Sequence, residues 1–306
     1  MIHQAAYNIK RWYLMFTGKS VWHVNQDLGK CFSRVEIRGY YNNMTEKVTK
    51  MPELLETEEL PKLNLAGGQF TYFPVAIFQY GLGAYDLYLQ TSDKRYKHKF
   101  LQCVSWALGH QDEQGRWNNF SHYCPETPYG AMAQGEGASL LIRAYIHSGD
   151  NMYLLFARRA LDFMVQSVTD GGTSTYLGED VIFNEYTHLP IVMNGWIFAW
   201  FGLYDYVLAT NDTGKYKSIL DRSSNTLIKY LPRFTTWYWS KYDLSNKLAS
   251  PFYHNLHIAQ MQAMYQLTGR SEYNEFAIRW ERYQKNFVYK SLAFVIKATQ
   301  KIFEKD

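Results

Sequence analysis

Two kinds of helical pattern alternate along the chain between about residues 72 and 285. One kind is apolar on nearly every side, as in YFPVAIFQYGLGAYDLYL and IVMNGWIFAWFGLYDYVLA, which is typical of helices that are buried all round. The other kind, such as MYLLFARRALDFMVQ, keeps a polar face and is typical of helices that border solvent. The alternation predicts inner and outer helices in an all-α fold, an incomplete (α/α) toroid.

The helices repeat in pairs. Short turns rich in capping residues separate the two members of each pair, at residues 92–93, 148–150, 211–212 and 268–271. A tyrosine opens each second helix, and these tyrosines recur at intervals of about 60 residues, at Tyr96, Tyr153, Tyr216 and Tyr273. The repeat predicts about four helical hairpins.

The links between hairpins are much longer than the turns within them. Residues 111–130, 169–191 and 232–253 each form a link of about 20 residues, whereas most connections have about four to six. Each link joins an outer helix to the next inner helix, so all three are expected at one rim of the ring, where the inner helices begin. Long loops on one rim often build a site, and free N–H groups at helix N-termini favour an anion. The alternative is that the loops only cap the toroid.

The two ends of the chain follow other patterns. SVWHVNQDLG and FSRVEIRGYY alternate like strands, so we expect residues 1–65 to form a short β-hairpin or extended arm that packs on the ring or on a second subunit, which allows a homodimer. Residues 66–306 are expected to form the catalytic toroid. After Asn286, FVYKSLAFVIKATQKIF predicts a closing amphipathic helix.

Composition favours a carbohydrate partner. Aromatic residues make up 17% of the chain, with 26 Tyr and 9 Trp, which suits stacking on sugar rings. The formal net charge of +4 is compatible with an anionic polymer, but no Lys/Arg run of the kind found in nucleic-acid-binding arms is present. The three cysteines have neither metal-type nor disulfide spacing, and no segment matches a signal peptide or a membrane span, so a cytoplasmic location is expected.

The long links and the helix starts after them collect ionisable and aromatic residues. They are Arg116, Trp117, His122, Tyr123, Glu126, Gln134, Glu136 and Arg143 in the first region, Glu185, Tyr186, His188 and Asn194 in the second, and Tyr242, Tyr253, His254, His257 and Gln260 in the third. Glu136 also fits a buried carboxylate that bonds a neighbouring loop. His254 and His257 have a spacing that zinc could use, but no third ligand has matching context, so no metal is expected. They are expected instead to satisfy loop backbone groups or to hold a substrate carboxylate.

Six short segments of the chain resemble parts of the C-terminal catalytic domain of heparosan and heparan-sulfate glucuronyl C5-epimerases. They are FQYGLGAYD, AMAQGEGASLLIRAY, NEYTHLPIVMNGW, GLYDY, YDLS and YHNLHIAQM, in the same order over about residues 72–285. The resemblance implies that Glu185, Tyr186, Tyr242 and Tyr253 carry catalysis and that Asn194 contacts the substrate. The chain departs from the family pattern at Ser245, where a basic residue is usual, and at Phe252, where Asp is usual.

The implied reaction converts D-glucuronate to L-iduronate units in a heparosan-like polysaccharide. The C5 proton lies α to the C6 carboxylate, so inversion needs a base on one ring face and a proton donor on the other. No cofactor is expected, because the glycine-rich fingerprint of a dinucleotide site is absent. We expect the remaining substrate-binding residues to include Arg116, Trp117, Gln134, Arg143, His254 and His257.

Three other functions fit parts of the pattern. A uronate-specific polysaccharide lyase starts with the same proton abstraction and then expels the C4 leaving group. A glycoside hydrolase needs paired carboxylates, for which Glu185 with Glu136 or Glu126 is the candidate pairing. A non-catalytic glycan-binding toroid explains the aromatic residues but leaves Glu185-Tyr186 and Tyr253-His254 without a purpose.

Overall fold

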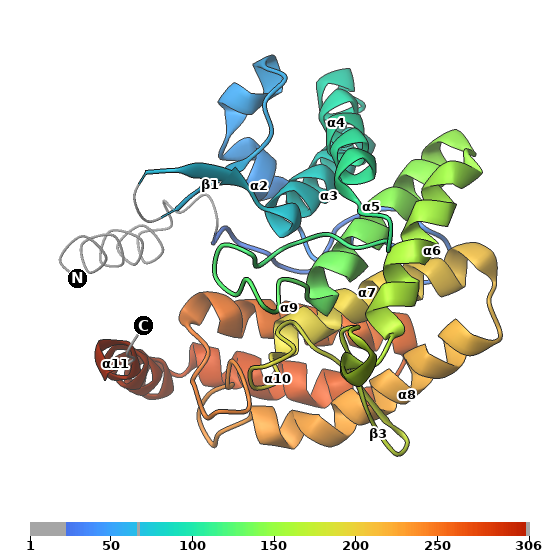
Figure 1. Cartoon of the computed structure of the whole chain (residues 1–306). Coiled ribbons are helices and arrows are strands. Elements are labelled where there is room, and N and C mark those ends of the chain that lie inside the picture. Colours follow the sequence, from blue (N-terminus) through green and yellow to red (C-terminus); the bar gives the residue numbers. More distant parts are fainter. Residues whose placement is uncertain (1–22, 66–67, 304–306) are drawn as a thin grey trace.

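Four antiparallel helical hairpins dominate the computed structural model, which describes residues 23–65 and 68–303. They follow one another around an incomplete ring, from the blue-green pair to the orange-red pair in Figure 1. The pairs are α3 (Pro74–Thr91) with α4 (Lys94–His110), α5 (Ala131–Ser148) with α6 (Asn151–Val165), α7 (Met193–Thr210) with α8 (Lys215–Tyr230), and α9 (Pro251–Thr268) with α10 (Ser271–Lys285). The predicted (α/α) toroid is confirmed, and α11 (Phe287–Phe303) is the expected C-terminal helix.

The turns within the hairpins are tight for a local reason. Each inner helix ends in a residue with left-handed backbone geometry, with φ of 60° at Ser92, 76° at Gly149, 52° at Asn211 and 72° at Gly269. Asp93 and Asp150 then accept hydrogen bonds from backbone N–H groups in the first turns of α4 and α6. Chain reversal is therefore determined by a few adjacent residues.

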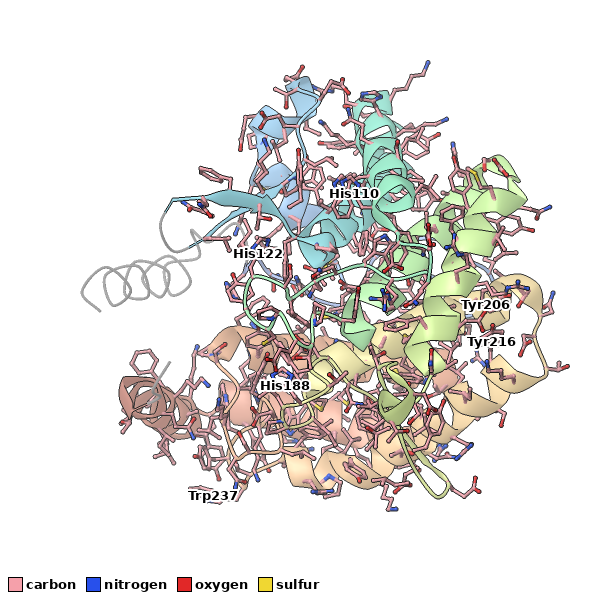
Figure 2. The ribbon with its side chains drawn as sticks, viewed as in Figure 1. His110, His122, His188, Tyr206, Tyr216 and Trp237 are labelled. Atoms are coloured by element: carbon pink, nitrogen blue, oxygen red, sulfur yellow. The ribbon has the colours of Figure 1, made fainter. Side chains whose placement is uncertain are left out.

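The repeated tyrosines join neighbouring outer helices. Tyr216 on α8 donates a hydrogen bond to Asp162 of α6 at 2.6 Å, and its ring lies against Tyr206, 4.9 Å between centroids (Figure 2). Tyr273 on α10 is hydrogen-bonded in the same way to Ser224 of α8, 2.9 Å between their hydroxyl oxygens. The repeat seen in the sequence thus marks contacts between successive hairpins.

Two inner helices approach closely because glycine lies at their contact. A Cβ atom placed on Gly202 of α7 would lie 2.2 Å from the carbonyl oxygen of Gly135 on α5. Any larger residue would force the two backbones apart. The glycines in these apolar helices therefore bring the two helices into direct backbone contact.

Residues 23–44, the first described part of the N-terminal arm, have an irregular backbone and do not form the regular β-hairpin that was one of the two expected forms. Antiparallel backbone hydrogen bonds join Gly29 to Tyr41 at 2.8 Å and Gly39 to Cys31 at 3.1 Å, but only an isolated bridge between Leu28 and Asn42 is formed. The arm continues through α2 (Thr45–Thr49) and the 3₁₀ helix η1 (Pro52–Glu56). The start of SVWHVNQDLG lies outside the described residues.

Regular strands occur in two short antiparallel hairpins instead. One joins β1 (Lys62–Asn64) to β2 (Phe70–Tyr72), and the other joins β3 (Ser174–Leu177) to β4 (Asp180–Phe183). Two further 3₁₀ helices, η2 (Val168–Asp170) and η3 (Leu231–Phe234), lie in the long links. In the part of the chain that the structure describes, no helix has the length and apolar character that a bilayer span needs.

The arm packs against the inner helices through a buried polar network. Arg143 of α5 donates to the carboxylate of Asp205 on α7 at 2.7 Å and to the carbonyl of Gly39 in the arm at 3.0 Å. Tyr41 donates to the other oxygen of Asp205, and the Tyr40 backbone N–H donates to Asp86 of α3 at 2.9 Å. Arm and ring share one hydrophobic core, and the domain boundary at residue 65 stays a prediction.

This network predicts a large loss of stability in Arg143→Met. The Arg143 and Asp205 side chains are fully buried, so removal of the guanidinium leaves a buried carboxylate without its cation. We expect the free energy of unfolding in urea to fall by about 3 to 5 kcal/mol. Lys285→Met is the control, because its ion pair with Glu281 is largely exposed and is expected to contribute about 1 kcal/mol at most. A loss in Arg143→Met as small as in the control would contradict this role.

Candidate active site

The three long links meet at the rim where the inner helices begin. The Ala131 N–H at the start of α5 donates to the Asn184 carbonyl at 2.8 Å, which ties the first link to the second. The Leu244 N–H donates to the Ile191 carbonyl at 3.1 Å, which ties the third link to the second. The predicted clustering of these links at one end of the ring is confirmed.

A cavity of about 260 Å³ opens among these links. Glu185 and Tyr186 from the second link, Asn194 from the first turn of α7, and Tyr242 and Tyr253 from the third link and α9 all line it. Segments far apart in sequence thus supply one shared wall. The expectation that these residues meet in one cleft is confirmed, while their catalytic roles stay a prediction.

Glu185 is held where water barely reaches it. It lies two residues after the end of β4, its side chain is packed against Gly195 of α7, and only 7% of the residue is exposed. Its Oε2 atom has no hydrogen-bond partner among the described residues. Burial disfavours the charged form and raises the pKa of Glu185 to about 7. Its carboxylate therefore holds a proton more strongly than an exposed glutamate and suits proton transfer near neutral pH.

Tyr253 is placed by the start of α9. Ser250 caps this helix by accepting a hydrogen bond from the Tyr253 N–H, and Pro251 occupies the first turn, a combination typical of helix N-termini. The Tyr242 ring lies 4.7 Å from the Tyr253 ring between centroids, and the two side chains are hydrogen-bonded. The two hydroxyl groups therefore form a coupled pair at the cavity wall.

The other tyrosine of the predicted set lies on the second link. Tyr186 stacks on Phe120 with 4.5 Å between ring centroids, which fixes its ring between the first and second links. Burial, followed by the nearby Glu185 charge, raises the pKa of both Tyr186 and Tyr242 well above the usual value of tyrosine. Both hydroxyls keep their protons at neutral pH and can donate hydrogen bonds or protons.

Asn194 completes this part of the wall. It is 3% exposed, and its Oδ1 atom has no hydrogen-bond partner among the residues that the structure describes. Gln260 of α9 donates to the Asn194 backbone carbonyl at 3.1 Å and so links α7 to α9 beneath the site. The position of Asn194 fits the predicted contact with substrate.

His254 and His257 lie behind the wall and not in it. Both rings are buried and share the Ser240 hydroxyl, at 2.8 Å from His254 Nδ1 and 3.0 Å from His257 Nδ1. His254 also bonds the Trp280 carbonyl. Burial lowers the pKa of His254 to about 3 and holds that of His257 well below the usual value of histidine, so both rings are neutral. Neither ring lines the cavity, so the structure does not bring them to the substrate contact that was one of their two predicted roles. The backbone N–H of Ser240 in the third link donates to His254 Nδ1 at 3.3 Å, which fits the other predicted role.

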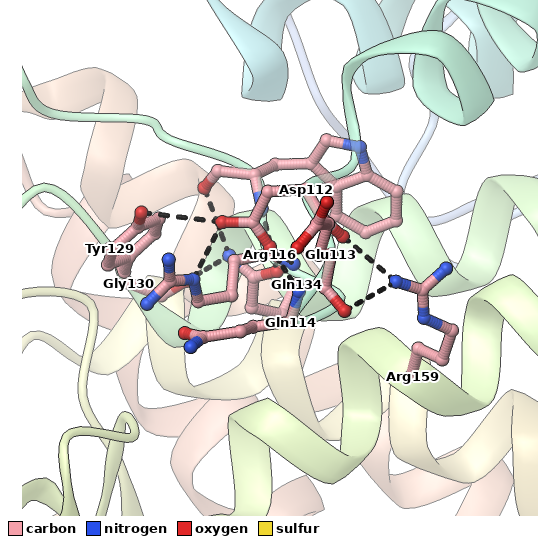
Figure 3. Close-up of polar contacts among 9 residues, drawn as sticks. Asp112, Glu113, Gln114, Arg116, Tyr129, Gly130, Gln134 and Arg159 are labelled. Carbon is pink, nitrogen blue, oxygen red and sulfur yellow. Dashed lines mark hydrogen bonds and ion pairs between the residues drawn. The ribbon is translucent and has the colours of Figure 1, made fainter.

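Three predicted substrate contacts, two in the first link and one at the start of α5, support the loop instead (Figure 3). Arg116 binds the Asp112 carboxylate at 2.7 Å and lies over the Tyr129 ring, 4.3 Å from its centroid. Trp117 is fully buried, and Gln134 bonds the Trp117 backbone through both amide atoms. None of the three lines the cavity. Their residue types and their positions in or beside a long link are typical of substrate-binding residues, but their hydrogen-bond partners lie within the protein.

Arg143 also lies away from the cavity, in the network with Asp205 and the arm. The exposed histidines at the same rim, His122 and His188, are labelled in Figure 2 and bond Thr71 and Thr127 at 2.9 and 2.7 Å. Within residues 23–65 and 68–303, no group of three or more His, Cys, Asp or Glu side chains could hold a metal ion. A zinc site at His254 and His257 would therefore lack a third ligand of these types among the described residues.

The arm supplies cavity residues that the sequence analysis missed. His23, Gln26 and Lys47 all line the cavity, although they precede the first inner helix. Behind Lys47 lies Glu136, which is fully buried and accepts a hydrogen bond from Gln79 of α3 at 2.9 Å. Only the fold of the arm against the ring brings these residues to the site, so no local signal in the sequence could have found them.

Comparisons with known proteins identify relatives of much of the ring. The model of the family described as D-glucuronyl C5-epimerase C-terminus matches residues 111–282. A D-glucuronyl C5-epimerase of Caenorhabditis elegans is 26% identical over 218 residues, covering 62% of this chain and 35% of its own length. An uncharacterized protein of Methanocaldococcus jannaschii is 30% identical over 159 residues, covering 49% and 51%. The chain thus spans about a third to a half of these relatives.

Two solved structures share the fold at low sequence identity. An α-1,6-mannanase variant of Salegentibacter sp. in complex with α-1,6-mannotetrose has a TM-score of 0.50 and 18% identity, covering 74% of this chain and 68% of its own. A UGL variant with dGlcA-Glc-Rha-Glc has a TM-score of 0.50 and 13% identity, covering 82% and 66%. At these identities the likeness concerns the toroid fold alone.

Proposed function

The chain belongs to the D-glucuronyl C5-epimerase C-terminus family, and we propose that it converts D-glucuronate to L-iduronate units in a heparosan-like polysaccharide. One observation carries the proposal. A buried glutamate of raised pKa and a hydrogen-bonded tyrosine pair come from separate links and line one cavity. Inversion at carbon needs two such groups, one for each face of the sugar ring.

The proposed reaction begins at Glu185. Its carboxylate accepts the C5 proton, and the electron pair of the broken C5–H bond spreads onto the C6 carboxylate of the sugar. A buried carboxylate whose pKa is about 7 is half ionised at neutral pH, so the base form is present and its affinity for a proton is high. Asn194, whose side-chain oxygen is buried at the wall, is placed to hold a sugar hydroxyl.

The inversion is completed from the tyrosine side. Tyr253 gives its hydroxyl proton to C5 on the opposite face, which forms the new C5–H bond and leaves a phenolate. Tyr242, hydrogen-bonded to Tyr253, stabilises that phenolate by donating to it. Glu185 then releases its proton and Tyr253 regains one from solvent, so the protein returns to its starting state. The steps are proton transfers, and the proposal requires no redox cofactor.

Deuterium incorporation tests this proposal. Heparosan incubated with the protein in D₂O should gain deuterium at C5 in both the gluco and the ido units, because both proton carriers exchange with solvent between turnovers. The chain length of the polymer should stay the same. Proton NMR of the polymer, together with size-exclusion chromatography, measures both quantities.

The rival functions give different results in the same experiment. A lyase would shorten the polymer and produce ultraviolet-absorbing 4,5-unsaturated ends, because the C4 substituent leaves in place of reprotonation. A glycan-binding protein would retain heparosan on a column and give neither deuterium at C5 nor shorter chains. Either result would overturn the epimerase proposal.

A further inference from the structure

Lys47 is the one lysine or arginine among the described residues that line the cavity. It belongs to the short helix α2 of the arm, outside residues 111–282, and it is only 5% exposed. A lysine is rarely buried to this extent unless a negative charge or a ligand accompanies it. Its position at the cavity raises the question of which anion it serves.

Glu136 provides part of the answer. It lies behind Lys47 and Gln79, is fully buried, and has one oxygen bonded to Gln79 while Oε2 has no hydrogen-bond partner within the described residues. Burial lowers the pKa of Lys47 to about 8, and the Glu136 charge offsets only part of that effect. Burial likewise raises the pKa of Glu136 to about 8. The Glu136 charge therefore favours the charged form of Lys47 at the cavity wall.

We propose that Lys47 is the carboxylate-binding residue of this site, whose ammonium group holds the C6 carboxylate of the uronate. The inference rests on the proposed function, since that function supplies the anionic sugar. Besides Lys47 the cavity wall presents Glu185, His23, tyrosines, uncharged amide side chains and apolar side chains, so Lys47 is its one lysine or arginine among the described residues, and a carboxylate entering such surroundings needs a cation. The arm thus completes a site whose proton carriers all come from the ring.

The same charge would act during the reaction. When C5 loses its proton, negative charge builds on the C6 carboxylate, and an ammonium group beside it stabilises that charge more strongly than it stabilises the ground state. Glu136 is then a positioning residue. Its partial negative charge favours the protonated form of Lys47, and its bond to Gln79 fixes the carboxyl group behind the lysine.

Ligand discrimination tests this role. Binding of a heparosan octasaccharide and of its carboxyl-reduced counterpart would be measured by calorimetry for the wild type, Lys47→Met and Lys47→Arg. The wild type should prefer the carboxylated ligand, and Lys47→Met should bind it about 10- to 100-fold more weakly, as expected for loss of a charged hydrogen bond. Affinity for the reduced ligand should change little. Lys47→Arg should keep most of the preference.

Two further variants separate this role from a structural one. Lys50→Met removes a lysine from the end of the same helix, where it pairs with Glu46 at the surface, and should bind both ligands like the wild type. The double variant Lys47→Met/Glu136→Gln removes both buried charges, so it should fold even where the single variant is unstable, and it should show the same loss of preference.

The outcomes distinguish this inference from the function on which it rests. A folded Lys47→Met or double variant that prefers the carboxylated ligand as strongly as the wild type does would overturn the role of Lys47. Absence of deuterium at C5 with the wild-type protein would instead remove the epimerase proposal. Loss of discrimination in Lys47→Met would still show that Lys47 recognises a uronate carboxylate.

Discussion

Glu185→Gln is expected to lower the turnover of heparosan by about 10²- to 10⁴-fold, the usual contribution of a general acid or base. Glutamine keeps the shape of the side chain beside Gly195 but cannot accept the C5 proton. Deuterium incorporation at C5 and formation of iduronate should therefore fall together. The matched control is Glu275→Gln, an exposed position on α10, which should retain full activity.

Glu185→Gln should also make the protein more stable than the wild type at alkaline pH. The folded pKa of Glu185 is about 7 and the ordinary value is 4.5, so the neutral form favours the folded state below pH 4.5 and that advantage is lost as pH rises through 7. Glutamine cannot ionise, so relative to the wild type the variant should gain up to about 3 kcal/mol between pH 5 and pH 8. Denaturant unfolding at both pH values measures this. Equal pH dependence in the two proteins would show that Glu185 is not buried as described.

Tyr253→Phe should have an effect of similar size on turnover, about 10²- to 10⁴-fold, with little loss of stability. The substitution removes one hydroxyl from a half-buried ring and leaves the Ser250 cap of α9 in place. Single-turnover measurements on heparosan would give the rate of inversion, and thermal unfolding would confirm the fold. A variant with nearly the wild-type rate would mean that the proton reaches C5 from another group.

Tyr242→Phe and Tyr265→Phe provide two comparisons for the rate of Tyr253→Phe. Tyr242 is hydrogen-bonded to Tyr253, so its loss should slow inversion less severely, by weakening the support of the phenolate. Tyr265 lies near the far end of α9, the helix whose first turn holds Tyr253, and is 38% exposed, so Tyr265→Phe should leave the rate unchanged. The order of the three rates tests whether the hydroxyl of Tyr253 itself gives the proton.

The helical ring was predictable because its signals are local. An apolar stretch with helical periodicity, a left-handed residue and an Asp cap lie within a few residues of one another, as at Ser92 and Asp93, and they determine one hairpin without help from distant residues. Once inner and outer helices alternate, chain connectivity requires the long links to share a rim. The meeting of Glu185, Tyr242 and Tyr253 follows from that topology together with the family resemblance.

The residue types at the rim predicted substrate contacts less well, because a residue type alone does not show which group its side chain bonds. Trp117, Gln134 and His254 look like ligand-binding groups in sequence, but each is satisfied inside the protein by a backbone group or a hydroxyl. A buried polar side chain needs a hydrogen bond wherever it lies, so structural and functional positions carry the same residue types.

The sequence by itself determined the four hairpins, the rim that holds the long links and the identity of the candidate proton carriers. Only the tertiary structure decided what the arm does, including the burial of Tyr41 at Asp205 and the place of Lys47 in the cavity wall. The physical reason is the range of the interactions. A helix and its turn are stabilised by groups a few residues apart, whereas the arm has little regular structure of its own and is positioned by contacts with helices more than a hundred residues away.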